Sequence, residues 1–346
     1  MYAAVTAGVC QVDLVNRPAP VLGSGQVLVE VDQVGLCGTD GHIWAGAYPA
    51  KPLPLVQGHE IAGRITSSAD DVSGRAEGTR VVIEPVIPCG RCHACRKGRA
   101  NACRQMIVLG VHDDGGLCEV IAVAADRAHP AEDVPQAVAP LVEPTSIALQ
   151  AVARSAGASG DRALVLGCGP IGLLAIVALR ERGVRVAAAD LVSGRTRTAE
   201  RFGAELTHVV DRENGYPGTA QRRELSEWSE GEGPGVVIEA TGVPASLEAA
   251  VDLVASAGRV VAVGISDARA RLSMKTLPYK ELDLLGSRNS NQLFPSAIDF
   301  VTRNGALLEG LVSHRFTLAE TQSALELAHA PGDDVRKIVI SVAEGR

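Results

Sequence analysis

The segment from Ala163 to Asp190 limits the architecture of this chain more than any other part of the sequence. It reads as a short apolar strand (Ala163–Leu166), a turn with three glycines, an apolar helix (Pro170–Arg182) and a second strand (Arg185–Ala189). A strand, a helix and a second strand in this order form a parallel βαβ unit, whose strands are buried on both faces. The segment therefore predicts a parallel sheet covered by helices.

The same pattern continues further along the chain. Two more short apolar strands are expected at Val236–Ala240 and Arg259–Gly264, with a helix near Ala245–Ala255 between them. Strands that alternate with helices predict a doubly wound α/β domain. We place this domain at residues 150–286. The polar, glycine-rich stretch Asp211–Gly235 is expected to lie at its surface.

The glycine turn has the spacing of a dinucleotide-binding site. Gly167 allows the tight turn from strand to helix, Gly169 lets the backbone approach a pyrophosphate, and Gly172 lets helix and strand pack closely. The free N–H groups at the start of the helix attract phosphate. The cofactor-binding residues predicted from this motif are Gly167, Gly169, Pro170, Ile171 and Gly172.

Asp190 ends the second strand, about twenty residues after the turn, where the fingerprint places an acidic residue. Its carboxylate would accept hydrogen bonds from the ribose hydroxyls and repel a 2′-phosphate, which favours NAD over NADP. Leu191 follows it, where NADP enzymes often carry a basic residue. Arg195 and Arg197 lie a little further on and keep NADP open as an alternative. A helix N-cap is the other interpretation of Asp190.

The first 149 residues have a different character. Short β segments, for example Val27–Val31, Arg80–Ile83 and Glu119–Val123, alternate with turns rich in Gly and Pro. A helix is expected at Pro295–Asn304 and a last strand at Lys337–Val342. We predict an irregular β-rich domain that precedes the α/β domain, and mixed elements after it.

Four of the eight cysteines lie within one short loop, at Cys89, Cys92, Cys95 and Cys103. Four thiolates at this spacing suit a closed tetrahedral zinc site, which stabilises structure and leaves no open position for chemistry. An iron–sulfur cluster fits less well, because the bacterial ferredoxin pattern has a three-residue last gap followed by Pro. Here the gap has seven residues and Arg104 follows. Buried free thiols are the remaining alternative.

Composition narrows the choice of partners. The chain of 346 residues carries a net charge of −7 and only 3% aromatic residues, which argues against a nucleic-acid partner. The longest apolar run, Val165–Leu179, is too short and too broken by Gly and Pro to span a bilayer. The start of the chain shows no basic region before an apolar stretch, so we expect no export signal and a cytoplasmic protein.

Another set of metal-binding residue types lies in the first part of the chain. Cys37 and His59 are about twenty residues apart on two predicted loops, and Glu60 follows His59 directly. Glu143, in Leu141-Val-Glu-Pro144, is a further acidic candidate. A catalytic zinc takes three protein ligands and keeps one open position. The sequence leaves open whether Glu60 or Glu143 is the third ligand.

These motifs together resemble the zinc-containing medium-chain dehydrogenase/reductase superfamily over essentially the whole chain. The motifs that carry the resemblance are Cys37-Gly-Thr-Asp-Gly-His42, Gly58-His-Glu60, the Cys89–Cys103 loop, Glu143-Pro144, the Gly167–Gly172 turn with Asp190, and Glu239-Ala-Thr-Gly242. The resemblance implies a GroES-like catalytic domain (1–149 and 287–346, with a structural zinc lobe at 85–105). A Rossmann NAD-binding domain (150–286) would be inserted into it.

The resemblance also implies roles for individual residues. Cys37 and His59 would bind a catalytic zinc, with Glu60 as a ligand or switchable partner. Thr39 would donate to the substrate oxygen, His42 would end a proton relay, and Asp40 would orient a zinc ligand. Gly38 replaces the basic residue that some relatives direct at the pyrophosphate, and Lys337 or Arg336 is expected to supply that charge. The cofactor residues expected in addition to the glycine turn are Asp190, Arg195, Thr241, Val263 and Lys337.

Glu143 occupies a position where simple alcohol dehydrogenases carry Cys, which makes the chain look like polyol and sugar dehydrogenases. Lys280-Glu281 and Gly286-Ser-Arg-Asn289 are similar to the sugar and sugar-acid branch, in which an Arg near Arg288 lies by the active site. The expected reaction is NAD-linked oxidation of a secondary alcohol of a polyol, sugar, sugar acid or cyclitol, with two zinc ions per chain. An L-threonine-type dehydrogenase and a non-catalytic NAD-binding protein are the alternatives. A homotetramer or homodimer is expected from the resemblance.

Overall fold

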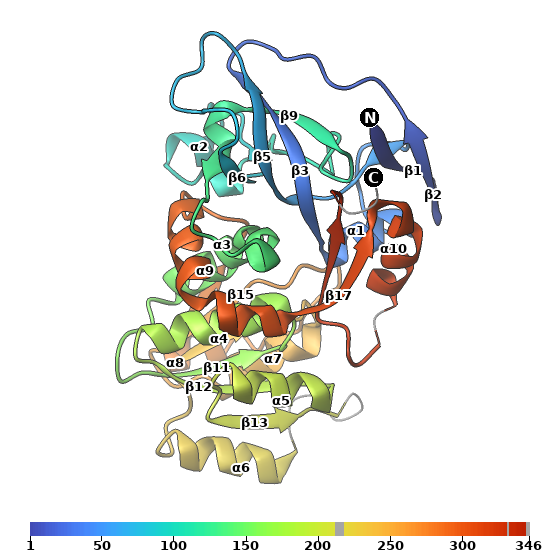
Figure 1. The fold of residues 1–346 in the computed structure, drawn as a ribbon. Coiled ribbons are helices and arrows are strands. Elements are labelled where there is room, and N and C mark those ends of the chain that lie inside the picture. Colours follow the sequence, from blue (N-terminus) through green and yellow to red (C-terminus); the bar gives the residue numbers. More distant parts are fainter. Residues whose placement is uncertain (212–217, 331, 344–346) are drawn as a thin grey trace. The chain divides into compact units, whose positions relative to one another are not determined.

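A computed structural model describes residues 1–211, 218–330 and 332–343 (Figure 1). Its contacts divide the chain into two compact units. The first consists of Met1–Ser146 and Asn291–Arg346, and the second of Ile147–Ser290. The first unit is thus assembled from both ends of the chain, and the second is one continuous insertion.

The first unit is built mainly from antiparallel strands. Its largest sheet has the order β10-β6-β5-β3-β18-β17, and β9 also pairs with β3. Among the described strands of this sheet, β17 and β18 pair in parallel and the other pairs are antiparallel. The strands of this sheet are β3 (Gln26–Leu36), β5 (Glu60–Ser68), β6 (Arg80–Ile83), β9 (Val120–Ala124), β10 (Ala128–Pro130), β17 (Val312–Thr317) and β18 (Lys337–Ser341). The smaller sheets contain β1 (Tyr2–Gly8), β2 (Gln11–Asn16) and β4 (Leu55–Val56), and β7 (Val86–Ile87) and β8 (Ile107–Val108).

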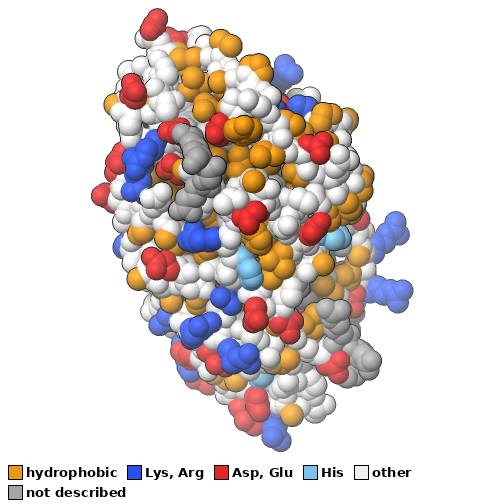
Figure 2. All heavy atoms as spheres, turned by 45° about the vertical axis from the view of Figure 1, so that its right-hand side comes forward, with side chains coloured by type: hydrophobic (Ala, Val, Ile, Leu, Met, Phe, Trp, Pro, Cys, Tyr) orange, Lys and Arg blue, Asp and Glu red, His pale blue; other side chains and the backbone are white. Residues whose placement is uncertain are grey.

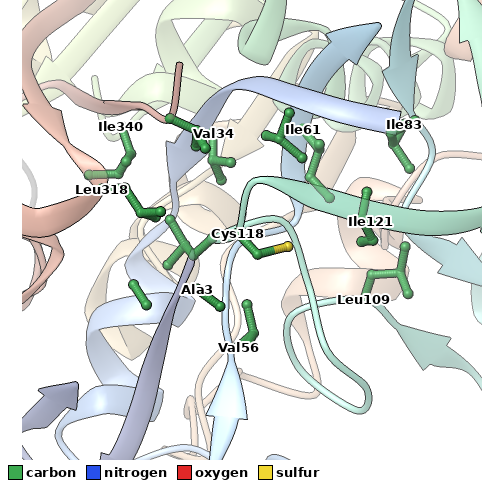
Figure 3. Packing of buried hydrophobic residues seen from close by; sticks show 14 of the residues in the cluster. Ala3, Val34, Val56, Ile61, Ile83, Leu109, Cys118, Ile121, Leu318 and Ile340 are labelled. Atoms are coloured by element: carbon green, nitrogen blue, oxygen red, sulfur yellow. The ribbon is translucent and has the colours of Figure 1, made fainter. Parts of the chain in front are cut away.

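Alternation of apolar and polar residues explains why β3 lies at the centre of this unit. Val27, Val29 and Val31 are buried while the residues between them are only partly buried. From Gln33 to Leu36 every residue is buried, so this end of the strand is buried on both faces. The apolar side chains meet those of neighbouring strands, for example Val34, Ile61, Cys118 and Ile340 in Figure 3. This core fixes the strand ends from which the candidate metal ligands project.

Short helices connect the strands of the first unit. Those that matter for the site begin directly after β3 (α1) and after a 3-10 turn (α3). The helices are α1 (Gly38–Trp44), α2 (His93–Arg96), α9 (Phe294–Leu308) and α10 (Thr321–His329), together with the start of α3 (Val142–Ser155), which continues into the second unit. The 3-10 turns are η1 (Ala100–Ala102), η2 (Ala125–Arg127), η3 (Gln136–Leu141), η4 (Glu309–Leu311) and η5 (Leu318–Glu320).

The second unit contains a six-stranded parallel sheet of order β13-β12-β11-β14-β15-β16. The chain starts at β11 in the middle, moves outward to one side and returns to build the other, as in a doubly wound fold. The strands are β11 (Arg162–Leu166), β12 (Arg185–Asp190), β13 (Leu206–Val209), β14 (Val236–Glu239), β15 (Arg259–Ala262) and β16 (Asp283–Gly286). The helices are α4 (Pro170–Glu181), α5 (Ser193–Arg201), α6 (Thr219–Trp228), α7 (Pro244–Leu253) and α8 (Thr276–Lys280).

These two architectures confirm the predicted fold class of a GroES-like β-rich domain with a doubly wound parallel-sheet domain. The expected strands at Arg80–Ile83 and Arg185–Ala189 and the expected helix at Pro170–Arg182 differ from the observed elements by at most one residue at an end. The stretch Asp211–Gly235 was incompletely predicted, because it contains α6, whose Leu225 is buried in the core. Its few apolar residues hide the helical period. Residues 212–217 of that stretch lie outside the described residues.

Charged side chains of both signs alternate over the face drawn in Figure 2. That mixture agrees with the modest net charge of −7. Among the described residues, no helix combines the length and apolar character needed to cross a bilayer.

Candidate metal sites and the nucleotide turn

Cys37 stands at the junction between β3 and α1. Its backbone N–H donates to Asp40 Oδ2 over 2.9 Å, so the third residue of the helix caps the helix start. The Sγ atom lies 3.8 Å from Thr39 Oγ1. The strand end and the cap together fix the direction of the thiol.

His59 lies in the tight segment that leads into β5. Gly58, just before it, has a φ of +89°, and a Cβ there would lie 2.7 Å from a methyl carbon of Val34. Only glycine fits this conformation and this space. The His59 ring is buried, and its Nδ1 has no hydrogen-bond partner, with Asp40 Oδ1 at 3.6 Å.

Charges around His59 favour a cation at this position. Burial by itself lowers the pKa of the imidazole, but Asp40, Cys37 and Glu143 outweigh it and raise the pKa well above the ordinary value. The same negative groups would stabilise a divalent metal ion. The unpartnered Nδ1 close to Asp40 also fits a ring whose other nitrogen binds metal, since ligating histidines commonly donate to a carboxylate.

Glu60 begins β5 directly after His59 and forms a buried ion pair. Lys337 Nζ donates to its two oxygens over 2.6 and 2.9 Å, and to the carbonyl of Leu36 over 3.1 Å. A Cβ on Gly35 would lie 2.0 Å from Glu60 Oε2, so the glycine leaves room for the carboxylate. Both side chains of the pair are buried.

Lys337 was expected to contact the cofactor pyrophosphate, but in the structure it contacts Glu60 and the carbonyl of Leu36. The side chain is 3% exposed and its ammonium is directed at Glu60. A buried charge needs a partner of opposite sign, and this carboxylate provides it. The observed contacts therefore give no support to the expected role. Arg336 is half-buried and donates to the carbonyl of Gly310 over 3.2 Å.

Glu143 lies in the first turn of α3 and is buried. Burial raises the pKa of its carboxyl to about 7; the nearby His59 lowers that pKa and Glu60 raises it further. Glu143 is thus an acidic group close to His59 that titrates near neutrality when no metal is bound. A cation beside it would favour its charged form.

Three of the four candidate ligands meet at one point. One ligand atom each from Cys37, His59 and Glu60 lie within 4.8 Å of one another. Among the described residues, Glu143 does not join that close group. Glu60 is already neutralised by Lys337, so the carboxylate of Glu143 remains the other candidate for the third position. A thiolate, an imidazole and a carboxylate are ligands that zinc accepts, so the residues fit a catalytic zinc.

The two residues expected in a proton relay lie on α1. Thr39 is half-buried and close to the thiol of Cys37. His42 is exposed in the last turn of the helix, and its ring contacts that of His329 edge-on, with centroids 6.1 Å apart. The helix therefore places one hydroxyl at the metal group and one imidazole in contact with solvent.

The four cysteines of the loop come together as expected for a closed metal site. One Sγ atom from each of Cys89, Cys92, Cys95 and Cys103 lies within 4.8 Å of the others. Cys92 Sγ is 3.5 Å from Cys95 Sγ and 3.8 Å from Cys103 Sγ. The loop includes α2 and η1 and packs on Val86 and Met106.

Backbone N–H groups surround these sulfur atoms. Those of Cys89 and Gln105 each donate to Cys103 Sγ over 3.3 Å. Backbone hydrogen bonds from Cys95 and Arg104 lower the pKa of Cys92 to about 6, whereas desolvation and the neighbouring thiols raise that of Cys95 to about 11. Four sulfurs that share one small volume and accept N–H bonds fit a tetrahedral zinc.

The glycine turn of the second unit has the expected geometry. Gly167 has a φ of +94°, and a Cβ on Gly172 would lie 1.8 Å from the Gly167 carbonyl oxygen. A Cβ on Gly169 would meet no atom within 4 Å. Gly169 caps α4, which begins at Pro170, and Ile171 follows in the first turn. The turn is therefore open at Gly169, where a phosphate would approach the helix start.

Asp190 lies at the end of β12, beside this turn. Its Oδ2 accepts from the N–H of Cys168 over 2.7 Å and its Oδ1 from that of Val192 over 2.9 Å. Arg195 Nη1 lies 4.0 Å from Oδ1. The carboxylate is buried and held by the backbone on both sides, so it is fixed at the edge of the nucleotide turn.

The remaining sequence-predicted cofactor residues follow neighbouring strands. The N–H of Thr241 donates to Glu239 Oε1 over 2.7 Å, and its hydroxyl binds the same oxygen. Val263 is buried directly after β15. In the sugar-dehydrogenase motif, Arg288 is exposed, and Lys280 Nζ donates to the carbonyls of Asp252 and Val254 at the end of α7. Lys280 thus has a structural contact.

Gln57 and its hydrogen-bond partner Thr6 were not singled out from the sequence. Gln57 is fully buried between Val56 and Gly58, and it contacts Thr6 of β1 and Asp40. A polar residue between a buried apolar pair and Gly58-His-Glu60 is the signal that would have identified it.

Two protein-family models match the chain. The model "Alcohol dehydrogenase GroES-like domain" matches residues 23–133, and the model "Zinc-binding dehydrogenase" matches residues 170–303. They correspond to the β-rich unit and the parallel-sheet unit described above.

Curated relatives and solved structures agree with these models. The chain is 33% identical over 328 residues to L-galactonate-5-dehydrogenase of Escherichia coli K12, covering 88% of this chain and 89% of the relative. It is 35% identical over 314 residues to D-altritol 5-dehydrogenase of Agrobacterium fabrum, covering 89% and 90%. The crystal structure of an alcohol dehydrogenase from Escherichia coli CFT073 complexed with NADH superposes with a TM-score of 0.90. That structure shows 30% sequence identity and 99% coverage of both chains.

The fold, the two metal-binding groups and these matches define a zinc-binding dehydrogenase that acts on alcohols. The chain belongs to the zinc-containing medium-chain alcohol dehydrogenase family, in its polyol-dehydrogenase-like branch. It is an alcohol oxidoreductase of small molecules that uses zinc and a nicotinamide cofactor.

Proposed function

We propose that this enzyme oxidises a secondary alcohol of a polyol, sugar, sugar acid or cyclitol to the ketone, with NAD⁺ as hydride acceptor. The observation that carries the proposal is the buried group Cys37, His59 and Glu60, with Glu143 beside it. The names of the relatives, which refer to L-galactonate and D-altritol, support a polyhydroxy substrate.

Cys37 and His59 would hold the catalytic zinc, with Glu60 or Glu143 as the third protein ligand. Zinc bound there supplies Lewis acidity, which lowers the pKa of an alcohol oxygen. Asp40 Oδ1, 3.6 Å from His59 Nδ1, would keep that ring in the orientation and tautomer that ligation requires. The four cysteines of the second group would hold a structural zinc.

The Thr39 hydroxyl would hydrogen-bond the substrate oxygen and relay the proton that the alcohol loses. Its position beside Cys37 supports this role. His42 would release the proton to water, because its ring is exposed to solvent and an imidazole can both accept and donate a proton. These roles assign proton transfer to α1. Metal binding is assigned to Cys37, just before α1, and to His59 and Glu60, where β5 begins.

Cofactor binding is assigned to the second unit. The glycine turn with its open position at Gly169 would receive the pyrophosphate, and Thr241 and Val263 would lie along the cofactor. Asp190 would accept from the adenosine ribose hydroxyls and disfavour a 2′-phosphate, which selects NAD over NADP. Arg195, 4.0 Å from Asp190, is the residue that would allow some NADP to bind.

The first test is zinc per chain measured together with NAD⁺ reduction on polyols, sugar acids, cyclitols, simple alcohols and L-threonine. We expect two zinc ions per chain and activity on a polyhydroxy substrate. Activity confined to L-threonine would select the amino-alcohol alternative. One zinc ion and no turnover on any alcohol would show that only the structural site is metal-bound, and the proposed activity would be wrong.

We further propose a homodimer or homotetramer in the cytoplasm. In the described part of the chain, β16 pairs on one side only, with β15. Leu284 in that strand, and Tyr279, Met274 and Ile265 before it, are large exposed apolar side chains. An unpaired strand edge flanked by apolar residues supports association with a second copy. Size measurement in solution tests this, and a monomer at micromolar concentration would contradict it.

A further inference from the structure

Gln57 presents a fully buried carboxamide in the segment that leads to His59. Its exposed fraction is 0%, and the preceding strand β4 (Leu55–Val56) is buried and apolar. Burying an amide group without hydrogen-bond partners costs about 2–7 kcal/mol. An apolar residue at this position would avoid that cost. The buried amide of Gln57 is therefore tolerated because it forms hydrogen bonds.

The carboxamide joins two other segments of the first unit. Its Oε1 accepts from Thr6 Oγ1 over 2.5 Å, and its Nε2 donates to the backbone carbonyl of Asp40 over 2.9 Å. Thr6 lies on β1 and is itself 1% exposed. Gln57 therefore connects the first strand of the chain, through its own side chain, to α1.

Asp40 continues this chain of contacts to both metal-binding segments. Its Oδ2 accepts from Cys37 N over 2.9 Å and its Oδ1 from Gly58 N over 3.3 Å. The same Oδ1 lies 3.6 Å from His59 Nδ1, and Asp40 is 0% exposed. The carboxylate is thereby set between the backbone N–H of Cys37 and the imidazole ring of His59.

The backbone around Gln57 is held independently of its side chain. Leu117 N donates to the Gln57 carbonyl over 3.0 Å, Gly115 N to that of Val56 over 2.7 Å, and Gly116 N to that of Gly58 over 2.8 Å. The path of the loop is thus fixed by the segment 115–117. What the side chain adds is the position of α1, with Asp40, relative to that loop.

We propose that Gln57, supported by Thr6, is a positioning residue for the metal ligand His59. It acts by fixing Asp40 through the backbone carbonyl, so that the carboxylate keeps its place between Cys37 and His59. The proposal rests on the proposed function, since it takes Cys37 and His59 to be ligands of the catalytic zinc. Groups that orient metal ligands in this way contribute about 10–100-fold to metal affinity.

The test measures zinc release from the purified, zinc-loaded protein to a coloured chelator. Gln57→Leu keeps the size of the side chain and removes both hydrogen bonds, and Thr6→Val removes only the donor to Gln57. The matched controls are Gln33→Leu, at a buried glutamine of β3 whose Oε1 has no partner, and Thr321→Val, at a buried threonine of α10. His59→Ala identifies which release phase belongs to the catalytic site.

We expect Gln57→Leu to accelerate that phase about tenfold, the lower end of the range for residues behind a ligand. Thr6→Val should accelerate it less, and the release phase of the four-cysteine site should stay unchanged in both. Cobalt substituted for zinc provides a second measurement, because its visible bands report ligand geometry. We expect these bands to shift in Gln57→Leu and not in Gln33→Leu.

Two results would be negative, and they are distinguishable. Zinc release and cobalt bands in Gln57→Leu that match those of Gln33→Leu, while His59→Ala still removes one zinc, would overturn the positioning role alone. Equal zinc content in His59→Ala and the unaltered protein would instead show that His59 is no ligand, and the proposed function would fail at its metal site.

Discussion

The ammonium of Lys337 binds both carboxylate oxygens of Glu60, over 2.6 and 2.9 Å, although the two residues are 277 positions apart in the chain. Glu60 begins β5 and Lys337 begins β18, and β3 lies between these two strands in the sheet. A charge from the last described strand thus neutralises an acid that belongs to the candidate metal group. This contact makes the C-terminal segment part of the site.

We expect Lys337→Met to destabilise the protein by about 3–5 kcal/mol, because the substitution leaves the Glu60 carboxylate buried without its partner. Adding Glu60→Gln should recover much of the loss, since the unpaired charge is then removed. Urea unfolding measures both changes. Lys51→Met, at an exposed pair with Asp113, is the control and should cost less than about 1 kcal/mol. If Lys337→Met and Lys51→Met lowered the free energy of unfolding equally, the buried ion pair would stabilise the protein no more than an exposed one.

The four-cysteine loop is expected to hold one zinc ion that stabilises the first unit without taking part in the reaction. Cys103→Ser removes a buried sulfur atom that accepts two backbone hydrogen bonds. We predict the loss of one zinc ion per chain and a lower unfolding temperature, measured by metal analysis and calorimetry. Cys10→Ser, at an exposed cysteine, should change neither. Full zinc content in Cys103→Ser would refute the assignment.

Two glycines of the nucleotide turn are expected to respond differently to a methyl group. Gly172→Ala places the Cβ against the Gly167 carbonyl oxygen, so we expect a loss of about 1–3 kcal/mol in stability from overpacking. Gly169→Ala meets open space, so stability should be kept.

For Gly169→Ala, NADH affinity should nevertheless fall at least about tenfold, a loss of 1.4 kcal/mol, because the methyl occupies the space of the pyrophosphate. Fluorescence titration with NADH measures the affinity, and thermal unfolding measures the stability. Unchanged NADH binding in Gly169→Ala would place the phosphates elsewhere.

Thr39→Val is predicted to reduce turnover by about 100-fold, within the usual contribution of a positioned proton-transfer group. NADH affinity should stay unchanged, because the hydroxyl is assigned to the substrate. Thr39→Ser keeps the hydroxyl and should retain most of the activity. Steady-state kinetics on the best polyol and NADH titration give the two quantities. A parallel loss of turnover and NADH affinity would contradict the role.

Much of the fold could be predicted because its signals are local. The glycine spacing from Gly167 to Gly172, the apolar strands on either side and Asp190 all lie within one βαβ unit. The cysteine loop is equally local, and its four residues are close in sequence as well as in space. Helix α6 was missed because Leu225 is its only fully buried residue, and a single apolar position gives no visible period.

The partners of charged and amide groups could not be predicted in this way. The resemblance implies a pyrophosphate contact for Lys337 or Arg336, because Gly38 stands where some relatives carry a basic residue. Which group neutralises Lys337 depends on β18 pairing with β3 next to β5. Likewise, Gln57 is only a polar residue beside a motif until β1 and α1 bring Thr6 and Asp40 to it.

The sequence by itself therefore determined the two-part architecture, the residue types of both metal groups and the nucleotide turn. These follow from periodicity and from ligand chemistry, which depend on neighbours along the chain. Only the tertiary structure decided that Glu60 is neutralised by Lys337, that Glu143 stands apart from the close group of three candidate ligands, and that Gln57 donates a hydrogen bond to Asp40. These are contacts between distant segments, and buried polar groups take whichever partner the packing of strands and helices brings within hydrogen-bond distance.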